Sequence, residues 1–388
     1  MTMIIGWAHT PFGKLDARTL EDLIVEVSRE AIAHAGLSPE DIDEVVLGHF
    51  NTGFSRQGFT ASLVHQADPA LRFKPATRVE NACATGSAAL FQGARAIRAG
   101  DARTVLVVGA ETMSGCSGAE VGANLLRAAY LPEDGEIQGG FAGVFGQIAS
   151  RYFATYGDQS DALARIAAKS HRNALSNPYA HLRKDLDYDF CRTPSDRNPF
   201  VAGPLKRTDC SPVSDGAAAV VLTRDDLAAS APRAVRLRSM THVQDFLPMS
   251  RRDPIAFEGC AKAWEQGLAS AQMSLADLDL VETHDCFTIA ELIEYEAMGL
   301  AAPGQGVRVV EEGLAEIGGR LPINPSGGLK AKGHPIGATG VSMHAIAAMQ
   351  VCGQAPEGMQ IPDAQIAGVF NMGGSGVANY VSILERVR

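Results

Sequence analysis

The chain has 388 residues, of which 46% are hydrophobic, and its formal net charge is -10 at pH 7. This size and composition suit a soluble globular protein with two or three domain-sized units, and the acidic charge without a basic run argues against non-specific nucleic-acid binding. No bilayer-spanning apolar stretch and no signal-peptide pattern occur, and the seven cysteines have no zinc-type spacing, so we expect a cytoplasmic protein.

The first predicted unit is a helix, a turn and a strand that recur later in the chain. Residues 31–49 end an amphipathic helix, open a turn at a serine, carry Asp-x-Asp and continue as an apolar strand, and residues 267–284 repeat this order. The matching turn residues are Ser38, Asp41 and Asp43 in the first segment and Ser274, Asp277 and Asp279 in the second. This similarity indicates an internal duplication, and each amphipathic helix is predicted to pack on a sheet.

Apolar runs alternate with helices along the chain. We expect strands at residues 45–47, 104–108, 217–222, 235–237, 280–283 and 366–370. The alternation favours an α/β fold in two halves. Residues 114–212 break the rhythm with Gly-rich and polar stretches, which we interpret as an insertion. An irregular segment of this length is typical of a functional element, such as a cover over an active site.

Cys83 lies between an extended segment and an Ala-rich helix, in the sequence NACATGS. The positive end of the helix dipole is expected to favour its thiolate form over a free thiol. A buried structural cysteine among alanines is the alternative interpretation of this segment taken alone.

A second group of reactive residues, His284-Asp285-Cys286-Phe287, ends the apolar strand of the second half. The carboxyl end of such a strand commonly presents functional side chains. This segment therefore offers an imidazole and a thiol at one edge of the sheet.

Two glycine-rich segments complete the candidate site. Residues 324–328 and 333–340 set His334 in a loop that leads into a helix, and an imidazole beside a cysteine is the arrangement that nucleophilic catalysis requires. The Ala-Thr-Gly after His334 repeats the Ala-Thr-Gly after Cys83. Residues 371–376 follow a strand, and their N–H groups could form an oxyanion-binding nest with that of Cys83, or could simply turn between two strands.

Five motifs together resemble the thiolases in order and spacing, over essentially the whole chain: NACATG around Cys83, GAETMS at 109–114, SDGAAAV at 214–220, NPSGG at 324–328 and GHPIGATG at 333–340. HDCF at 284–287 and HRNALSNP at 171–178 are similar to the branch related to sterol-carrier-protein thiolases. The resemblance implies the thiolase fold, which is α/β with two duplicated βαβαβαββ halves in five αβαβα layers and an inserted loop domain.

The domain boundaries expected from this resemblance place the N-terminal half at 1–113, completed by about 213–225. The loop domain over the active site would take 114–212, and the C-terminal half 226–388. The family also implies a homodimer or tetramer, and a small accessory protein is a further partner that we consider.

The resemblance implies CoA-dependent acyl transfer that makes or cleaves a carbon–carbon bond beside a thioester. Cys83 would be acylated, His334 would activate it, and His284 would help to hold the thioester oxygen. The backbone of Gly373 would form a second oxyanion hole with that of Cys83. CoA would be a substrate or product, with no tightly bound cofactor and no metal.

One residue departs from the family pattern, because Asn371 stands where the cysteine of the C-x-G motif is usual. The HDCF branch implies that Cys286 takes the role of second acid/base instead. A weaker match places Ser239 against the pantetheine arm of CoA. The other cysteines, Cys116, Cys191, Cys210, Cys260 and Cys352, match no catalytic motif and are interpreted as structural.

Three other functions stay open from the sequence. Asn371 keeps open a non-catalytic or partner-dependent thiolase-like subunit. A related condensing enzyme would lack the arrangement of residues 333–340, and a retro-aldolase of steroid side chains would not need Cys83. The presence of Cys83, His334 and His284 favours the acyltransferase. Acyl chain length and the direction of reaction are left undetermined.

Overall fold

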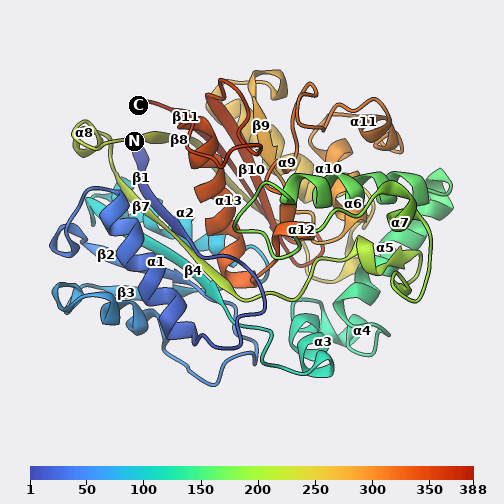
Figure 1. Ribbon diagram of the computed structural model, residues 1–388, viewed down its shortest axis with the longest axis horizontal. Coiled ribbons are helices and arrows are strands. Elements are labelled where there is room, and N and C mark those ends of the chain that lie inside the picture. Colours follow the sequence, from blue (N-terminus) through green and yellow to red (C-terminus); the bar gives the residue numbers. More distant parts are fainter.

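A nine-stranded mixed sheet runs through the molecule in this computed structural model, which describes residues 1–388 (Figure 1). The strand order is β3-β2-β4-β7-β1-β8-β11-β10-β9. The N-terminal half contributes β1 (Thr2–His9), β2 (Glu44–Gly48), β3 (Ala76–Val79), β4 (Thr104–Glu111) and β7 (Gly216–Arg224). The C-terminal half contributes β8 (Val235–Gln244), β9 (Leu280–Glu282), β10 (Ile366–Gly373) and β11 (Ala378–Arg386).

The two halves of this sheet have the same topology. In the first, β2 is parallel to β3 and β4, and β7 is antiparallel to β4 and β1. In the second, β9 is parallel to β10, and β11 is antiparallel to β10 and β8. Ile323 takes the place of β3 with a single parallel bridge to Val281. The halves join where β1 and β8 pair antiparallel, so the predicted duplication and α/β class are confirmed.

The repeated turns are built by the same hydrogen bonds. Asp43 accepts bonds from two backbone N–H groups at the start of β4, at 2.8 and 3.0 Å. Asp279 accepts bonds from two N–H groups at the start of β10, at 2.8 and 2.9 Å. Each aspartate satisfies donors that would otherwise be unpaired at a strand start. The Asp-x-Asp pattern therefore fixes where each central strand begins.

Helices pack on both faces of each half of the sheet, so helices and sheet together form five layers (Figure 1). The helix α1 (Leu20–His34) covers the outer face of the N-terminal half, and α9 (Glu258–Ala271) covers that of the C-terminal half, with α10 (Thr288–Ala297) beside it. Between the halves lie α2 (Thr85–Ala99) and α13 (Ile336–Val351). Because α13 contacts strands of both halves, all of its residues are buried.

Glycines in the repeated Ala-Thr-Gly segments let α2 and α13 touch backbone to backbone. A Cβ atom on Gly86 would lie 2.7 Å from the backbone nitrogen of Gly340, and one on Gly340 would lie 2.2 Å from that of Ser87. No side chain fits at such distances. The crossing holds the first turns of the two helices together, which places the segments before them side by side.

The chain between β4 and β7 leaves the sheet and covers the C-terminal half beside α10 and α12 (Gly328–Lys332) (Figure 1). It contains α3 (Gly118–Leu126), α4 (Leu131–Asp134), α5 (Phe141–Tyr156), α6 (Ser160–Ala174), α7 (Tyr188–Arg192), β5 (Phe200–Ala202) and β6 (Leu205–Lys206). The ring of Phe145 on α5 stacks on that of Phe287, with centroids 4.5 Å apart. Because β7 returns to the first half of the sheet, we propose 1–113, 114–212 and 226–388 as domain boundaries, with 213–225 completing the first.

Three strands of the nine-stranded sheet lie outside the predicted apolar runs: β1, β3 and β11. The first has an apolar run at residues 3–8 and ends at His9, which bonds Ser342, whereas in the last the polar Asn379 interrupts the run and bonds the carbonyl of Gly376. The short edge strand β3 is only half-buried. Two short helices complete the elements, α8 (Asp225–Ala228) and α11 (Val307–Glu311). No helix combines the length and hydropathy that a bilayer crossing requires.

Candidate active site

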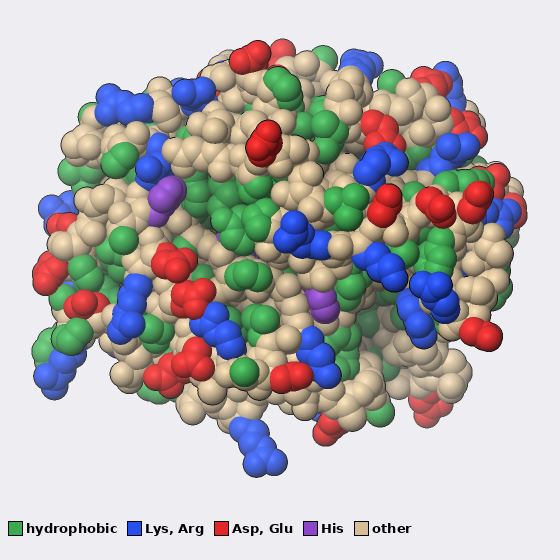
Figure 2. All heavy atoms as spheres, viewed as in Figure 1, with side chains coloured by type: hydrophobic (Ala, Val, Ile, Leu, Met, Phe, Trp, Pro, Cys, Tyr) green, Lys and Arg blue, Asp and Glu red, His purple; other side chains and the backbone are tan.

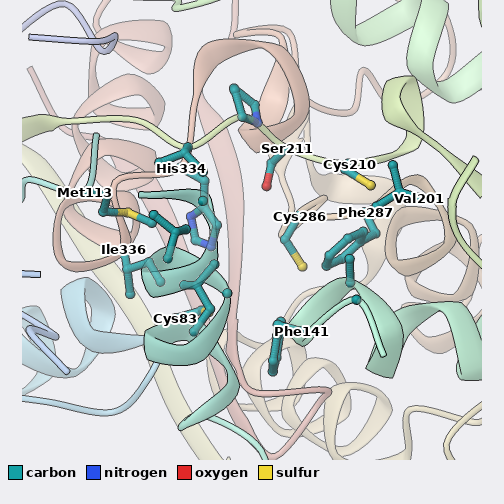
Figure 3. Close-up of a pocket in the computed structure, with 18 residues that line it drawn as sticks. Cys83, Met113, Phe141, Val201, Cys210, Ser211, Cys286, Phe287, His334 and Ile336 are labelled. Carbon is teal, nitrogen blue, oxygen red and sulfur yellow. The ribbon is translucent and has the colours of Figure 1, made fainter. Parts of the chain in front are cut away.

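A cavity of about 330 Å³ lies between the inserted region and the first turns of α2 and α13 (Figure 3). Its walls are mostly hydrophobic and include Phe141 and Val201 of the inserted region. Cys83, Cys286 and His334 also line it. Figure 3 shows the His334 imidazole beside Cys83, with the sulfur of Cys286 facing the same space from the other side. The fold thus brings three of the predicted site residues into one apolar cavity.

A tight turn before α2 positions Cys83. Ala82 has a left-handed backbone with φ of 47°. The Thr85 hydroxyl donates to the Ala82 carbonyl at 2.6 Å and accepts from the N–H of Asn81 at 2.9 Å. These bonds hold a strained turn that leaves Cys83 only 4% exposed, at the cavity.

The Cys83 thiol is protonated at neutral pH, which corrects the expectation from the helix dipole. Burial raises its pKa to about 12, because a thiolate there would lose its hydration. Hydrogen bonds from the N–H of Gly374 and from its own N–H oppose this effect without overcoming it. The thiol therefore needs a base at the moment of attack.

His334 presents a free lone pair to that thiol. The Thr339 hydroxyl donates to the carbonyl of Pro335 at 2.9 Å, so it accepts from Nδ1–H of His334, at 2.7 Å. The proton is then on Nδ1, and Nε2, which has no protein partner, carries the lone pair. Burial and the charge of Lys332 lower the pKa of His334 to about 3, so the ring is neutral.

His284 has the opposite tautomer, and Asn371 sets it. The amide nitrogen of Asn371 donates to the Cys83 carbonyl at 3.1 Å and contacts Nδ1 of His284 at 2.8 Å. A carbonyl only accepts, which fixes the amide orientation and makes Nδ1 an acceptor too. Nε2 of His284 therefore carries the proton and has no protein partner. Burial lowers the pKa of His284 well below its usual value, so this ring is also neutral.

The three groups converge closely. The sulfur of Cys83 and one ring nitrogen each of His284 and His334 lie within 4.8 Å of one another. The two imidazoles are nearly perpendicular, at 85°, with centroids 5.1 Å apart. One ring offers a lone pair and the other an N–H to the same small space. A thiol and two imidazoles are also the ligand types that Zn²⁺ prefers. A soft metal ion that entered the site would therefore bind at these three side chains.

Cys286 is buried in the cavity wall, 3% exposed. Burial raises the pKa of its thiol well above the usual value, and nearby Cys83 adds to this effect. The neighbouring Asp285 carboxylate accepts the backbone N–H of Leu329 at 2.6 Å. This bond ties the segment to α12 and so fixes the place of Cys286.

Gly373 ends β10 beside the Cys83 turn, and Gly374 follows it. A Cβ on Gly373 would lie 2.5 Å from the carbonyl oxygen of Asn81, so only glycine fits. The N–H that bonds the Cys83 sulfur belongs to Gly374, one residue beyond the predicted oxyanion-hole glycine. Of the predicted nest, residues 371–373 belong to β10 and only residues 374–376 lie in the turn that leads to β11, so the role of Gly373 in an oxyanion hole stays a prediction.

Ser239 does not belong to the cavity, so this prediction is corrected. It lies in β8 opposite Ile383, with its hydroxyl buried and unpartnered, because the strand's pleat turns it into the protein. Ser211 lines the cavity instead, and its N–H donates to the Cys286 carbonyl at 3.0 Å. Ser211 lies three residues before the SDGAAAV motif, and this proximity to a family motif could have identified it from the sequence. Sequence reasoning also missed Thr339 and the positive role of Asn371.

Family models match most of the chain. Residues 2–186 match the thiolase N-terminal domain, and residues 242–386 match the thiolase C-terminal domain-like model. An acetyl-CoA acetyltransferase of Methanothermobacter thermautotrophicus is 34% identical, over 99% of both chains. Sterol carrier protein 2 of Oryctolagus cuniculus is 32% identical, over 97% of this chain and 70% of its own.

Solved structures share the fold. An Ltp2–ChsH2(DUF35) aldolase has a TM-score of 0.84 at 24% identity, covering 100% of this chain and 98% of that one. An acetyl-CoA acetyltransferase from Syntrophomonas wolfei has a TM-score of 0.71 at 19% identity, covering 99% of each. At these identities the structures support the fold alone. With the matched domains and the full-length relatives, they lead to one conclusion: this chain belongs to the thiolase family.

Proposed function

We propose that this protein transfers acyl groups between CoA thioesters and a carbon nucleophile through an acyl-Cys83 intermediate. The observation that carries the proposal is the pair of opposite tautomers, a lone pair on His334 and an N–H on His284, directed at the space around Cys83. A thioester reaction needs both a base for the thiol and a donor for the developing oxyanion.

Family membership gives the chain a thiolase-type acyltransferase function, either Claisen condensation of acyl-CoA or CoA-dependent cleavage of 3-ketoacyl-CoA. The relatives named acetyl-CoA acetyltransferase support acetyl-CoA as one substrate of this chain. CoA then enters as substrate or product, and we propose no tightly bound cofactor.

We assign the acylation step to Cys83 and His334. In cleavage, the thiol proton passes to Nε2 of His334 while the sulfur attacks the 3-keto carbon. The bond between C2 and C3 then breaks, leaving an acyl-cysteine and the enolate of acetyl-CoA. Since the pKa of the thiol is about 12 and that of the imidazole about 3, the free site holds neutral partners, and proton transfer must accompany attack.

We assign the proton at the α-carbon to Cys286. Its thiol protonates the enolate, whose oxygen accepts from Nε2–H of His284, and acetyl-CoA leaves. CoA then gives its thiol proton to the Cys286 thiolate and attacks the acyl-cysteine. Cys83 departs as a thiolate and recovers its proton from His334, so all groups return to their starting states. The backbone N–H groups of Cys83 and Gly373 are our candidates for the acyl oxygen.

Asn371 fits this scheme as a positioning residue. A neutral amide cannot exchange a proton at physiological pH, so it does not replace the usual cysteine as acid/base. It holds His284 in the donor tautomer instead. This removes the reason for proposing a non-catalytic subunit, which was the absence of that cysteine.

The remaining proposals concern surroundings and partners. Ser211 is our candidate for contact with the pantetheine arm, in place of Ser239. A homodimer or tetramer, a cytoplasmic location and a small accessory protein stay predictions; the aldolase that shares the fold was solved as an Ltp2–ChsH2 assembly.

Acetylation of Cys83 tests the proposed function. The protein is incubated with acetyl-CoA, quenched in acid and digested for peptide mass spectrometry. We expect one acetyl group, on Cys83, that free CoA removes. Cys83→Ser should abolish the thioester label, whereas Cys210→Ser, a matched change at another cysteine of the same cavity, should keep it. Labelling of another residue with Cys83 unmodified would contradict the assignment.

A further inference from the structure

The four residues 373–376 end β10 and turn toward β11, and three of them are glycine. Gly374 donates its N–H to the sulfur of Cys83. Gly374 and Gly376 have left-handed backbones, with φ of 64° and 82°. Because glycine loses more backbone freedom on folding than any other residue, such a turn does not hold a hydrogen-bond donor in place by itself. Contacts from its surroundings must fix this N–H beside Cys83.

Two contacts within the hairpin of β10 and β11 hold the ends of this turn. The N–H of Val377 donates to the Gly373 carbonyl at 3.1 Å, and the side-chain amide of Asn379 donates to the Gly376 carbonyl at 2.9 Å. The Gly373 carbonyl and the Gly374 N–H belong to the same peptide group, so a hydrogen bond to one strengthens that of the other. Neither contact reaches the middle of the turn.

Arg252, in the connection between β8 and α9, holds the middle of the turn. Its guanidinium donates to the Ser375 carbonyl at 2.5 Å and to the Ser375 hydroxyl at 2.6 Å. Arg252 is the only residue outside the hairpin whose side chain bonds this turn. A planar guanidinium that makes two bonds to one residue fixes the orientation of that residue as well as its position.

The neighbouring Arg251 provides a contrast. Its guanidinium lies over the Phe246 ring, 3.7 Å from the centroid, and its side chain is exposed. Figure 2 shows other Lys and Arg side chains at the surface among Asp and Glu, where solvent screens their charges. Arg252 is instead half-buried, and burial lowers the pKa of its guanidinium although the Asp245 and Asp134 carboxylates oppose this effect. Partial burial strengthens the bonds of a charged donor, so Arg252 holds the turn more firmly than an exposed arginine could.

We propose that Arg252 is a positioning residue for the reaction, because it locks the glycine turn so that the Gly374 N–H stays on the Cys83 sulfur. This rests on the proposed function, in which that sulfur carries negative charge when it attacks the 3-keto carbon and again when it leaves the acyl group. A donor that is already in place stabilises this charge without reorganisation of the turn. Arg252 does not line the catalytic cavity, so its contribution should appear in the rate and not in substrate binding.

Substitution of the two neighbouring arginines tests this inference in the intact protein. Arg252→Ala should lower kcat for cleavage of acetoacetyl-CoA by about ten-fold with KM little changed, since one hydrogen bond to the charged sulfur loses its support. The rate of iodoacetamide alkylation of Cys83 should fall by a similar factor, because the same N–H stabilises the thiolate. Arg252→Lys keeps the charge without the forked pair of bonds and should lie between wild type and Arg252→Ala. Arg251→Ala, the matched control, should leave both rates unchanged.

Guanidinium rescue separates positioning from a merely structural role. Millimolar guanidinium chloride, far below denaturing concentrations, should restore part of the kcat that Arg252→Ala loses, because the ion can replace the missing donors to Ser375. Sodium chloride at the same concentration should restore none.

Two results would overturn the role of Arg252. One is a wild-type kcat and alkylation rate per folded molecule in Arg252→Ala, even if its unfolding free energy in urea is lower. The other is a loss of kcat that neither guanidinium nor Arg252→Lys reduces. If the wild-type protein never acylates Cys83, the proposed function fails instead, and the alkylation rates still test Arg252 because they need no substrate.

Discussion

His49 and His284 follow equivalent strands of the two halves, β2 and β9, and both are fully buried. Nδ1 of His49 lies 3.0 Å from the Thr60 hydroxyl, and its Nε2 lies 3.1 Å from a carboxylate oxygen of Glu111. His284 has one nitrogen occupied by Asn371 and the other free. The duplicated fold thus supplies a histidine twice. We propose that only His284, whose ring nitrogen lies beside Cys83 and not beside a carboxylate, takes part in the chemistry.

Glu111 shows what the first histidine does instead. Its carboxylate also accepts the N–H groups of Phe50 and Gly337, at 3.0 and 3.1 Å. Gly337 lies in the first turn of α13, just after His334. His49 therefore stabilises the frame that holds His334, our proposed base, while we assign His284 to the reacting group.

Cys286→Ala should break the chemistry of the second half most strongly. Loss of the acid/base at the α-carbon is expected to slow condensation, and exchange of the α-proton with deuterated water, by about 10²- to 10⁴-fold. Acetylation of Cys83 should survive, because His334 serves that step. Mass spectrometry of the acyl-enzyme and of deuterated acetyl-CoA measures both. Exchange at the wild-type rate would assign the proton transfer to another group.

Paired substitution of the two histidines tests the comparison directly. His284→Ala removes an oxyanion donor and should lower kcat by about 10²- to 10³-fold with little change in unfolding free energy. His49→Ala should leave kcat per folded molecule nearly unchanged but lower the unfolding free energy by about 2–4 kcal/mol, since buried Glu111 loses a partner. Urea denaturation and steady-state kinetics distinguish them. Equal loss of activity in both variants would refute the division of roles.

The pH dependence of Cys83 alkylation tests whether the nucleophile rests as a thiol. Because its pKa is about 12, the thiolate fraction should rise ten-fold per pH unit from pH 7 to about pH 10 without reaching a plateau. Iodoacetamide rates measured by peptide mass spectrometry follow this rise, and His334→Ala should lower them at neutral pH. A plateau below pH 8 would indicate a thiolate–imidazolium pair in the free enzyme instead.

Asn371→Ala should weaken the second half without removing a reacting group. Without the amide, His284 is free to place its proton on either nitrogen, so the donor tautomer is only partly populated. We expect kcat to fall by about ten-fold, because the variant loses the one hydrogen bond that orients His284 before reaction. Nitrogen-15 chemical shifts of His284 report the tautomer. A wild-type shift in this variant would mean that another contact sets the proton.

Motifs were sufficient to predict the duplicated α/β fold and the convergence of Cys83, His284 and His334, because glycine-rich turns and a repeated pattern leave strong local signals. The protonation state of Cys83 was predicted wrongly, since burial depends on the inserted region that closes over it and outweighs the helix dipole. The prediction that Ser239 contacts the pantetheine arm was wrong for a similar reason, because a short local match does not show on which face of β8 a side chain lies. The contact of Arg252 with Ser375 joins residues 123 positions apart, which no local pattern reveals.

Away from the proposed active site, equivalent substitutions in the two halves should have equal effects on stability. The repeated turns at Asp43 and Asp279 allow this to be measured. Asp43→Ala and Asp279→Ala each leave two N–H groups at a strand start without their acceptor. Because both strand starts are near solvent, water replaces part of each loss, and we expect each change to lower the unfolding free energy by about 1–2 kcal/mol. Activity of the folded enzyme should be unchanged in both, as neither residue lines the cavity. Urea midpoints that differ between the variants by more than the error would show that the halves diverged in stability as well as in chemistry.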